Sequence, residues 1–178
     1  ERAQKLDLLI HLLTNLQQSI VICGPEGIGK TSLLKELQAH QHEVWHFCNV
    51  QASSALSFES LTQQLGQSLE LSYGNQLDLN ALRRFCERQT VILIIDDAGQ
   101  LVPGLVSELV RFAEAFPGLR VIFAMRDDIL HLKSASEDAL NDCHLIEMPP
   151  LNRKQCLDFL KNFSVQSDSP LALNAITD

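Results

Sequence analysis

The octapeptide GPEGIGKT, at residues 24–31, decides how the rest of the chain is interpreted. It fits the pattern G-x-x-x-x-G-K-[ST] at every specified position. Glycines let a backbone turn tightly and aim successive N–H groups at one anion. The apolar run Ser19–Cys23 (SIVIC) before it predicts a strand, and Thr31–His40 after it predicts a helix. A strand, a glycine-rich turn and a helix in this order predict a loop that binds phosphate groups.

This loop is expected to hold the phosphates of a nucleoside triphosphate, and ATP with Mg²⁺ is the expected ligand. Lys30 would supply a mobile cation to the β- and γ-phosphates, so it counts as a catalytic as well as a binding residue. The Thr31 hydroxyl would be a ligand of Mg²⁺. A glycine-rich turn that binds no nucleotide is the alternative. The expected nucleotide-binding residues are Gly24, Pro25, Glu26, Gly27, Ile28, Gly29, Lys30, Thr31 and Ser32.

Two carboxylates, Asp96 and Asp97, directly follow Val91–Ile95 (VILII), the most apolar run in the sequence. Such a run predicts a strand that is buried on both faces. A carboxylate at the end of that strand would hold Mg²⁺ or its water shell, and Asp96 is the expected metal ligand. Asp97 stands where a general base could polarise the attacking water, which makes it a candidate catalytic residue. The alternative is that the aspartate pair only caps the following turn.

Arg126 follows the predicted strand Leu119–Met125. At that strand end it could stabilise the charge of the terminal phosphate, as a third candidate catalytic residue. An ion pair with Asp127 or Asp128 is the alternative role, and the sequence favours neither.

Asn49 lies near the end of the predicted strand 43–50. Its side chain could hydrogen-bond to Asp97 and hold that carboxylate away from the water. It could equally form a turn, because asparagine is common in turns.

Strands and helices alternate along the whole chain. This alternation predicts an α/β protein whose strands are parallel, whose crossovers are right-handed and whose sheet has helices on both faces. The predicted strands are residues 19–23, 43–50, 91–95, 119–125 and 144–148, and the predicted helices are residues 2–17, 31–40, 58–69, 78–88, 104–116, 136–140 and 152–163.

Composition narrows the classes of partner. The chain has 178 residues, with 14 Lys and Arg against 22 Asp and Glu, and its basic residues form no dense cluster. We therefore do not expect nucleic acid as a main partner, because binding it requires a basic patch. No apolar run approaches the ~20 residues of a membrane-spanning helix. The chain opens on Glu1 rather than Met, so any membrane segment is expected outside it.

The chain contains five cysteines, and none of them forms a Cys-x-x-Cys pair. No histidine stands at zinc-like spacing from them. We therefore expect five buried thiols in a reducing compartment.

The order of the motifs resembles a known family. After a leading helix come GPEGIGKT, a strand with Asn49 near its end, VILIIDDAGQL at residues 91–101, VIFAMR at 121–126 and IEMPPLNRKQCLDFL at 146–160. This order resembles the AAA+ ATPases of the ExeA/GspA secretion type. It is most similar to the ATPase domains of DamX-type cell-division proteins, which can be joined to a membrane helix and a peptidoglycan-binding SPOR domain.

The resemblance implies a three-layer α/β/α P-loop NTPase core with a five-stranded parallel sheet in order 5-1-4-3-2. It implies an AAA+ nucleotide-binding core at residues 1–150 and the start of a helical lid, truncated, at residues 151–178. A cytoplasmic location is also implied, either for the whole protein or for the cytoplasmic domain of an inner-membrane protein. The implied partners are the nucleotide and either further copies of the chain or an envelope protein.

We therefore expect an ATP-binding AAA+ domain with slow or partner-stimulated ATPase activity, which acts as a switch in cell division or secretion. Asp97 stands where AAA+ proteins usually carry glutamate, and Asp-Asp together with Arg126 also resembles the slowly hydrolysing STAND signalling ATPases. Two alternatives remain open. One is a scaffold that binds nucleotide without hydrolysing it, and the other is a DNA-associated ATPase of the transposition-helper kind.

Overall fold

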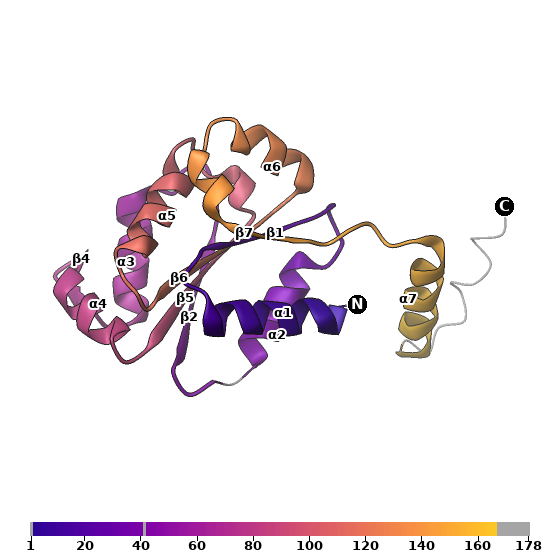
Figure 1. Ribbon diagram of the computed structural model, residues 1–178, viewed down its shortest axis with the longest axis horizontal. Coiled ribbons are helices and arrows are strands. Elements are labelled where there is room, and N and C mark those ends of the chain that lie inside the picture. Colours follow the sequence, from indigo (N-terminus) through magenta and orange to yellow (C-terminus); the bar gives the residue numbers. More distant parts are fainter. Residues whose placement is uncertain (1, 41, 167–178) are drawn as a thin grey trace. The chain divides into compact units, whose positions relative to one another are not determined.

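The computed structural model describes residues 2–40 and 42–166, and the chain divides after Met148 into two compact units. Figure 1 labels most of the elements. The first unit contains α1 (Arg2–Asn15), β1 (Ile20–Cys23), α2 (Lys30–Ala39), β2 (Trp45–Gln51), α3 (Phe58–Ser68), β3 (Ser72–Tyr73), β4 (Gln76–Leu77), α4 (Leu79–Cys86), β5 (Thr90–Asp96), η1 (Ala98–Gln100), α5 (Leu105–Glu114), β6 (Leu119–Met125), α6 (Asp127–Ser134), η2 (Asp138–Asp142) and β7 (His144–Glu147). The second unit contains α7 (Arg153–Gln166).

Five strands form one parallel sheet in the order β2-β5-β6-β1-β7. Numbered along these strands alone, that order is the expected 5-1-4-3-2 read from the other edge. In β1, Cys23 is paired with Met125 on one side and with Glu147 on the other. The strand that leads into GPEGIGKT therefore has a neighbour on both sides, which fixes where the loop begins.

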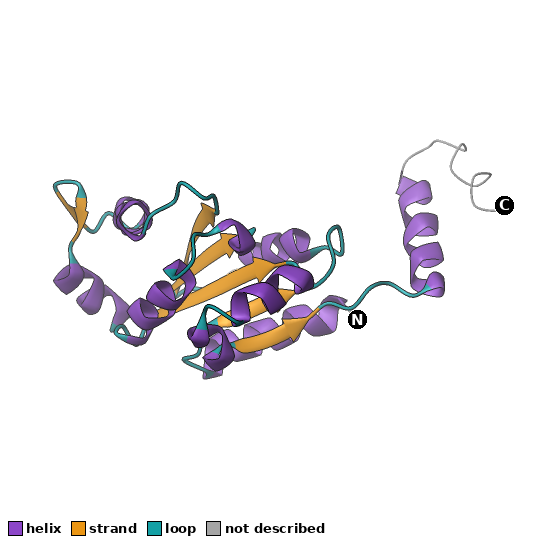
Figure 2. Cartoon of the chain, turned by 90° about the horizontal axis from the view of Figure 1, so that it is seen from above, coloured by secondary structure: helices purple, strands orange, loops and turns teal. Residues whose placement is uncertain are grey.

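Both faces of the sheet are covered by helices. Successive side chains of a strand point to opposite faces. In β1, Ile20 and Ile22 enter the apolar cluster of α1 and α2, whereas Val21 enters the cluster of α3, α4 and α5. In β6, Ile122 and Phe123 divide in the same way. Figure 1 shows α1 and α2 on one side of the sheet and α3 and α5 on the other, and Figure 2 shows the strands between helices. The expected α/β fold with three layers is confirmed.

Some element boundaries differ from the expectation. Strand β2 runs from Trp45 to Gln51, one residue further than the predicted strand 43–50. The sequence does not predict α6, because this helix buries none of its residues and so carries no periodic apolar pattern. The helix expected at 136–140 is the 3-10 helix η2, and a short antiparallel hairpin of β3 and β4 precedes α4.

In the second unit, Asn152 directly precedes α7, whereas the predicted helix 152–163 includes it. Its side chain accepts a hydrogen bond from the amide of Gln155 at 2.9 Å, and the Gln155 side chain accepts one from the amide of Asn152 at 2.8 Å. This reciprocal pair is a capping box, which satisfies two donors at the helix start. Of the helical lid expected at residues 151–178, residues 167–178 lie outside the described residues.

Aromatic rings cluster at the amino end of β2. Trp45, the single tryptophan of the chain, is 9% exposed. The His42 ring stacks on its indole with 4.5 Å between ring centroids and 13° between planes. Phe47 meets the indole edge-on at 6.1 Å. This cluster therefore stands at the opposite end of the strand from Gln51.

The cysteines are only partly as expected. All five are free thiols, of which Cys23, Cys48 and Cys86 are buried, Cys143 is half-buried and Cys156 is exposed. Burial raises the pKa of Cys86 to about 11 and that of Cys143 to about 12, so both are neutral at physiological pH. The expectation of five buried thiols is wrong for Cys156, which lies exposed on α7. No helix within the described residues is long and apolar enough to cross a bilayer.

Candidate functional site

The carboxyl ends of three neighbouring strands carry the residues that the sequence singles out. β1 leads into the glycine-rich loop, β5 ends at Asp96, and β6 is followed by Arg126. Ligands of open α/β sheets bind outside the carboxyl ends of the strands. A hollow is found at these strand ends. Three of the expected binding residues do not line it, namely Gly24, Pro25 and Ile28. Ile28 packs instead against the cluster of α1 and α2. The lining residues are Glu26, Gly27, Gly29, Lys30, Thr31, Ser32, Asp96, Asp97 and Arg126.

Glycine is required in the loop for two different reasons. Gly27 and Gly29 have φ values of 75° and 106°, in the left-handed region that favours glycine. At Gly24 the reason is space, since a Cβ there would stand 2.4 Å from the carbonyl oxygen of Met148. The Met148 amide in turn donates to the Cys23 carbonyl at 2.8 Å. The start of the loop is therefore packed directly against the backbone that follows β7.

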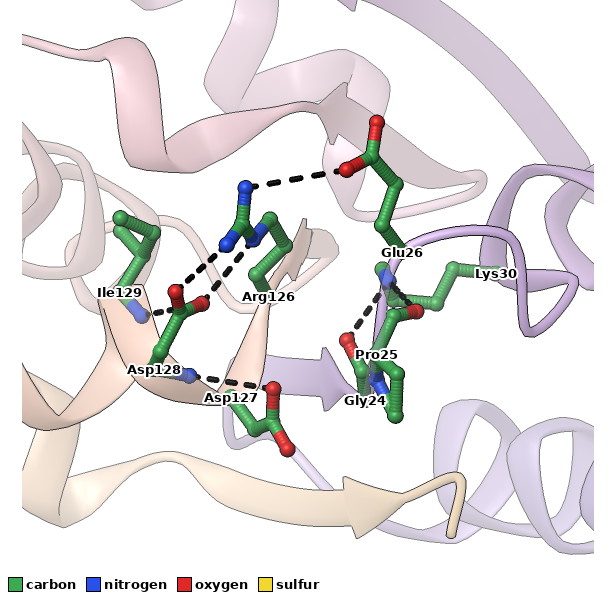
Figure 3. A network of polar contacts seen from close by, with 8 residues as sticks. All are labelled: Gly24, Pro25, Glu26, Lys30, Arg126, Asp127, Asp128 and Ile129. Carbon is green, nitrogen blue, oxygen red and sulfur yellow. Dashed lines mark hydrogen bonds and ion pairs between the residues drawn. The ribbon is translucent and has the colours of Figure 1, made fainter. Parts of the chain in front are cut away.

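Lys30 folds back over the start of the loop. Its ammonium donates to the carbonyl oxygens of Gly24 and Pro25, each at 2.7 Å (Figure 3). Burial lowers the pKa of Lys30, while the charges of Asp127 and Asp96 act in the opposite direction. Lys30 is also the first residue of α2, so its amine adds to the positive end of that helix. The loop thus concentrates positive charge where a phosphate would bind.

Thr31 and Asp96 place two oxygen atoms side by side. The Thr31 hydroxyl donates to Oδ2 of Asp96 at 2.7 Å, across 65 residues of sequence. Mg²⁺ is commonly held by one or two protein oxygens together with phosphate oxygens of the substrate. Within the described residues, no group of three or more His, Cys, Asp and Glu side chains could hold a metal ion on protein ligands alone. This pair therefore fits a Mg²⁺ ion whose shell is completed by phosphate and water.

Asp97 is exposed and borders the hollow. Its φ of 54° is uncommon for a residue other than glycine, although aspartate tolerates it better than most. The Asp97 amide donates to Oδ1 of Asp96 at 2.9 Å, and the Asp97 carboxylate accepts a long hydrogen bond from Nε2 of Gln51 at 3.4 Å. The carboxylate is thus oriented from β2 while it remains open to water.

Gln51, rather than Asn49, makes the side-chain hydrogen bond to Asp97. Asn49 donates to Oε1 of Gln38 on α2 at 2.6 Å, and it lies inside β2 rather than in a turn. Both roles considered for Asn49 are therefore wrong. The reason is the strand boundary, since Gln51 is the register partner of Asp96 and Asn49 stands two residues earlier. Extending the predicted strand by one residue would have identified Gln51, which shares a face with Asn49.

The Arg126 guanidinium is held by two carboxylates (Figure 3). Nε and Nη2 donate to the two carboxylate oxygens of Asp128 at 3.0 and 2.6 Å, and Nη1 lies 3.7 Å from Oε2 of Glu26. The hydrogen bonds to Asp128 raise the pKa of Arg126 and lower that of Asp128. Asp127 instead accepts from the Asp128 amide at 3.1 Å. The ion pair considered from the sequence thus forms with Asp128, and the guanidinium also borders the hollow.

A buried carboxylate, Glu137, connects the segments that follow β5 and β6. Its Oε1 accepts from the Gly104 amide at 2.6 Å, and its Oε2 accepts from the amide and the hydroxyl of Ser107 at 2.9 and 2.6 Å. Lys133 adds a hydrogen bond to the carbonyl of Leu101 at 2.7 Å. The sequence does not single out Glu137, because its partners lie about thirty residues away and form no motif with it.

Residues 14–133 match the family of AAA domains. No curated protein matches the chain. The solved structures provide several similar folds. Cdc6p from Pyrobaculum aerophilum has a TM-score of 0.66 at 21% identity, over 92% of this chain and 48% of that one. The Aeropyrum pernix ORC2 protein, solved as ADPNP–ADP complexes, has a TM-score of 0.65 at 14% identity, over 92% of this chain and 50% of that one.

The Drosophila ORC bound to DNA is similar to the same degree. Its TM-score is 0.66 at 18% identity, over 90% of this chain and 46% of that one. The chain therefore spans about half the length of these proteins. At such identities the likeness shows the fold alone, and roles at the site rest on the geometry of this chain.

Proposed function

The chain belongs to the AAA domain family, and from this premise we propose that it binds ATP with Mg²⁺ in the hollow and hydrolyses it slowly or under stimulation by a partner. One observation carries the proposal. The 2.7 Å contact between Thr31 and Asp96 joins the first turn of α2 to the end of β5, beside the Lys30 ammonium. A phosphate cradle and a pair of metal-binding oxygens are thus adjacent, as Mg-ATP requires.

In the proposed mechanism the loop amides and Lys30 bind the phosphates, and the Lys30 ammonium exchanges its two carbonyl contacts for phosphate oxygens. Thr31 and Asp96 would hold Mg²⁺, which when bound neutralises charge on the β- and γ-phosphates. Asp97 orients a water molecule and accepts its proton as the water oxygen bonds to the terminal phosphorus and the bond to the leaving oxygen breaks. Arg126 offers positive charge to the terminal phosphate.

Thermal unfolding with and without Mg-ATP tests the binding step. Ligand at 100 times its Kd adds about 2.7 kcal/mol to the stability of the folded state. For a domain of this size the midpoint should rise by roughly 5–10 °C. Lys30→Ala should abolish most of the rise. Lys35→Ala, which removes an exposed lysine from the same helix, should keep it. A wild-type midpoint that does not move with Mg-ATP would contradict the proposal.

A nucleotide-gated scaffold without hydrolysis is the second candidate. It is favoured by Asp97, whose side chain is one methylene shorter than the usual glutamate and is turned toward Gln51. Steady-state phosphate release distinguishes the two candidates. Release above background that Asp97→Asn abolishes, with Mg-ATP binding retained, supports the enzyme. Background release from a wild type that binds Mg-ATP, with and without membranes, supports the scaffold.

The process served is proposed from resemblance. Similarity to ExeA/GspA and DamX-type ATPases supports a role in cell division or secretion, at the cytoplasmic side of the envelope and with a homo-oligomer or an envelope protein as partner. In that scheme α7 begins a helical lid. Lys30→Ala in the whole protein should then impair division or secretion in cells.

A DNA-associated role is the rival process, and our expectation against nucleic acid receives no support from the comparisons. One structurally similar protein, the Drosophila ORC, was solved bound to DNA. Salt-dependent binding of duplex DNA at physiological ionic strength would favour this rival.

A further inference from the structure

Every nitrogen of the Arg126 guanidinium faces a carboxylate oxygen. Two nitrogens donate to Asp128, and the third lies 3.7 Å from Glu26. The two acids come from different elements, because Glu26 belongs to the glycine-rich loop and Asp128 to the first turn of α6. We propose that this arginine clamp, Glu26 and Asp128 around Arg126, competes with the terminal phosphate for the guanidinium and so limits how strongly the site prefers a triphosphate to a diphosphate. The inference rests on the proposed nucleotide binding.

The geometry makes the competition direct. An arginine recognises phosphate and carboxylate with the same planar fork of N–H groups. Asp128 occupies one edge of that fork with contacts of 3.0 and 2.6 Å. Nη1 is left for a phosphate oxygen, and Glu26 stands beside it. A phosphate that takes the edge formed by Nε and Nη2 therefore has to displace Asp128, and one that approaches Nη1 has to share it with Glu26.

The negative charge around the hollow also opposes the binding of a terminal phosphate. Among the residues that the structure describes, Lys30 and Arg126 are the only Lys or Arg side chains that line it, whereas three carboxylates line it, those of Glu26, Asp96 and Asp97. Mg²⁺ would offset Asp96 and Asp97, whereas the Glu26 carboxylate points toward Arg126 (Figure 3). Glu26 thus repels phosphate, and it also pairs with the Arg126 guanidinium that would attract phosphate. ADP ends one phosphate earlier than ATP, so it is affected only by the repulsion.

The test is to measure the affinities of Mg-ADP and of Mg-ADPNP, the non-hydrolysable imido analogue of ATP, by calorimetry on the whole chain. Glu26→Gln should raise the affinity for Mg-ADPNP about threefold, and Asp128→Asn about fivefold, with less than about a twofold change for Mg-ADP, because exposed ion pairs contribute modestly. The two variants alter different elements, so agreement between them excludes a local distortion of the loop.

Two controls make the result specific to Arg126. Glu36→Gln removes the same charge from α2, where Glu36 pairs with Arg2 at 2.9 Å, and it should leave the ratio of the two affinities unchanged. In an Arg126→Ala background, Glu26→Gln should lose its selective effect on Mg-ADPNP. Equal gains for both nucleotides, or gains that persist without Arg126, would overturn the clamp while leaving nucleotide binding intact. A wild type that binds neither nucleotide would instead overturn the proposed function.

Discussion

The loop at residues 24–31 and the segment at residues 126–137 follow neighbouring strands and border one hollow, but they are held in different ways. The loop is held largely by its backbone, with glycines at positive φ and carbonyls that accept from Lys30. The later segment is held by side chains, from the exposed pair of Arg126 and Asp128 to the buried Glu137.

Because of this difference, each region should be destabilised by a different kind of substitution. A backbone-defined loop should be sensitive to the addition of a methyl group. A side-chain-defined segment should be sensitive to the loss of a charged partner.

The largest effect is expected for Glu137→Ala. The variant leaves both donors of the buried Ser107 without an acceptor and also removes the acceptor of the Gly104 amide. Each unsatisfied buried donor costs about 1–3 kcal/mol, so the loss should be about 3 kcal/mol or more. The thermal midpoint should fall by roughly 6–12 °C.

Glu108→Ala is the matched control, because it removes an exposed carboxylate from the first turn of α5, the helix that contains Ser107. Its expected cost is below about 1 kcal/mol. Similar losses in the two variants would show that the buried contacts of Glu137 are not what holds the segment.

A smaller effect is expected in the loop, where two glycine variants should differ. Gly24→Ala places a methyl group 2.4 Å from the carbonyl oxygen of Met148, and such overpacking costs about 2 kcal/mol. Gly27→Ala has open space around the added methyl group, so only its φ of 75° opposes it, at about 1 kcal/mol. Urea unfolding without nucleotide measures both. A larger loss for Gly27→Ala would contradict the role given to Met148.

The smallest effect is expected for Arg126→Ala. Its side chain is half exposed and paired, so the unfolding midpoint should not change measurably. Affinity for Mg-ADPNP should fall about threefold, because the guanidinium is already shared with two carboxylates. Lys30→Ala, measured in the same titration, should cause a much larger loss. Equal losses of affinity in the two variants would contradict the expectation that the loop contributes more to nucleotide binding than Arg126 does.

The same division explains what the sequence could predict. GPEGIGKT was identified because left-handed turns and close packing require glycine at particular spacings. The five strands of the sheet were found because strands buried on both faces are continuous apolar runs. Their order came from resemblance to a family, since sequence periodicity does not contain the order of strands in a sheet.

The features that the sequence does not predict depend on residues that are remote in sequence. Helix α6 buries no residue, so no apolar period marks it. The sequence does not indicate Gln51, because the predicted strand 43–50 ends one residue before it, and strand ends are the least certain part of a pattern. Nothing near Glu137 in the sequence indicates that Ser107 is its partner.

The single tryptophan gives the molecule an internal optical reporter. Trp45 stacks on His42 at the amino end of β2, and six residues of extended strand, roughly 20 Å, separate it from Gln51 beside the site. Its emission should therefore respond to the melting of the sheet, but hardly to the ligand. Folding can thus be followed by fluorescence without a label while nucleotides are titrated at the far end of the strand.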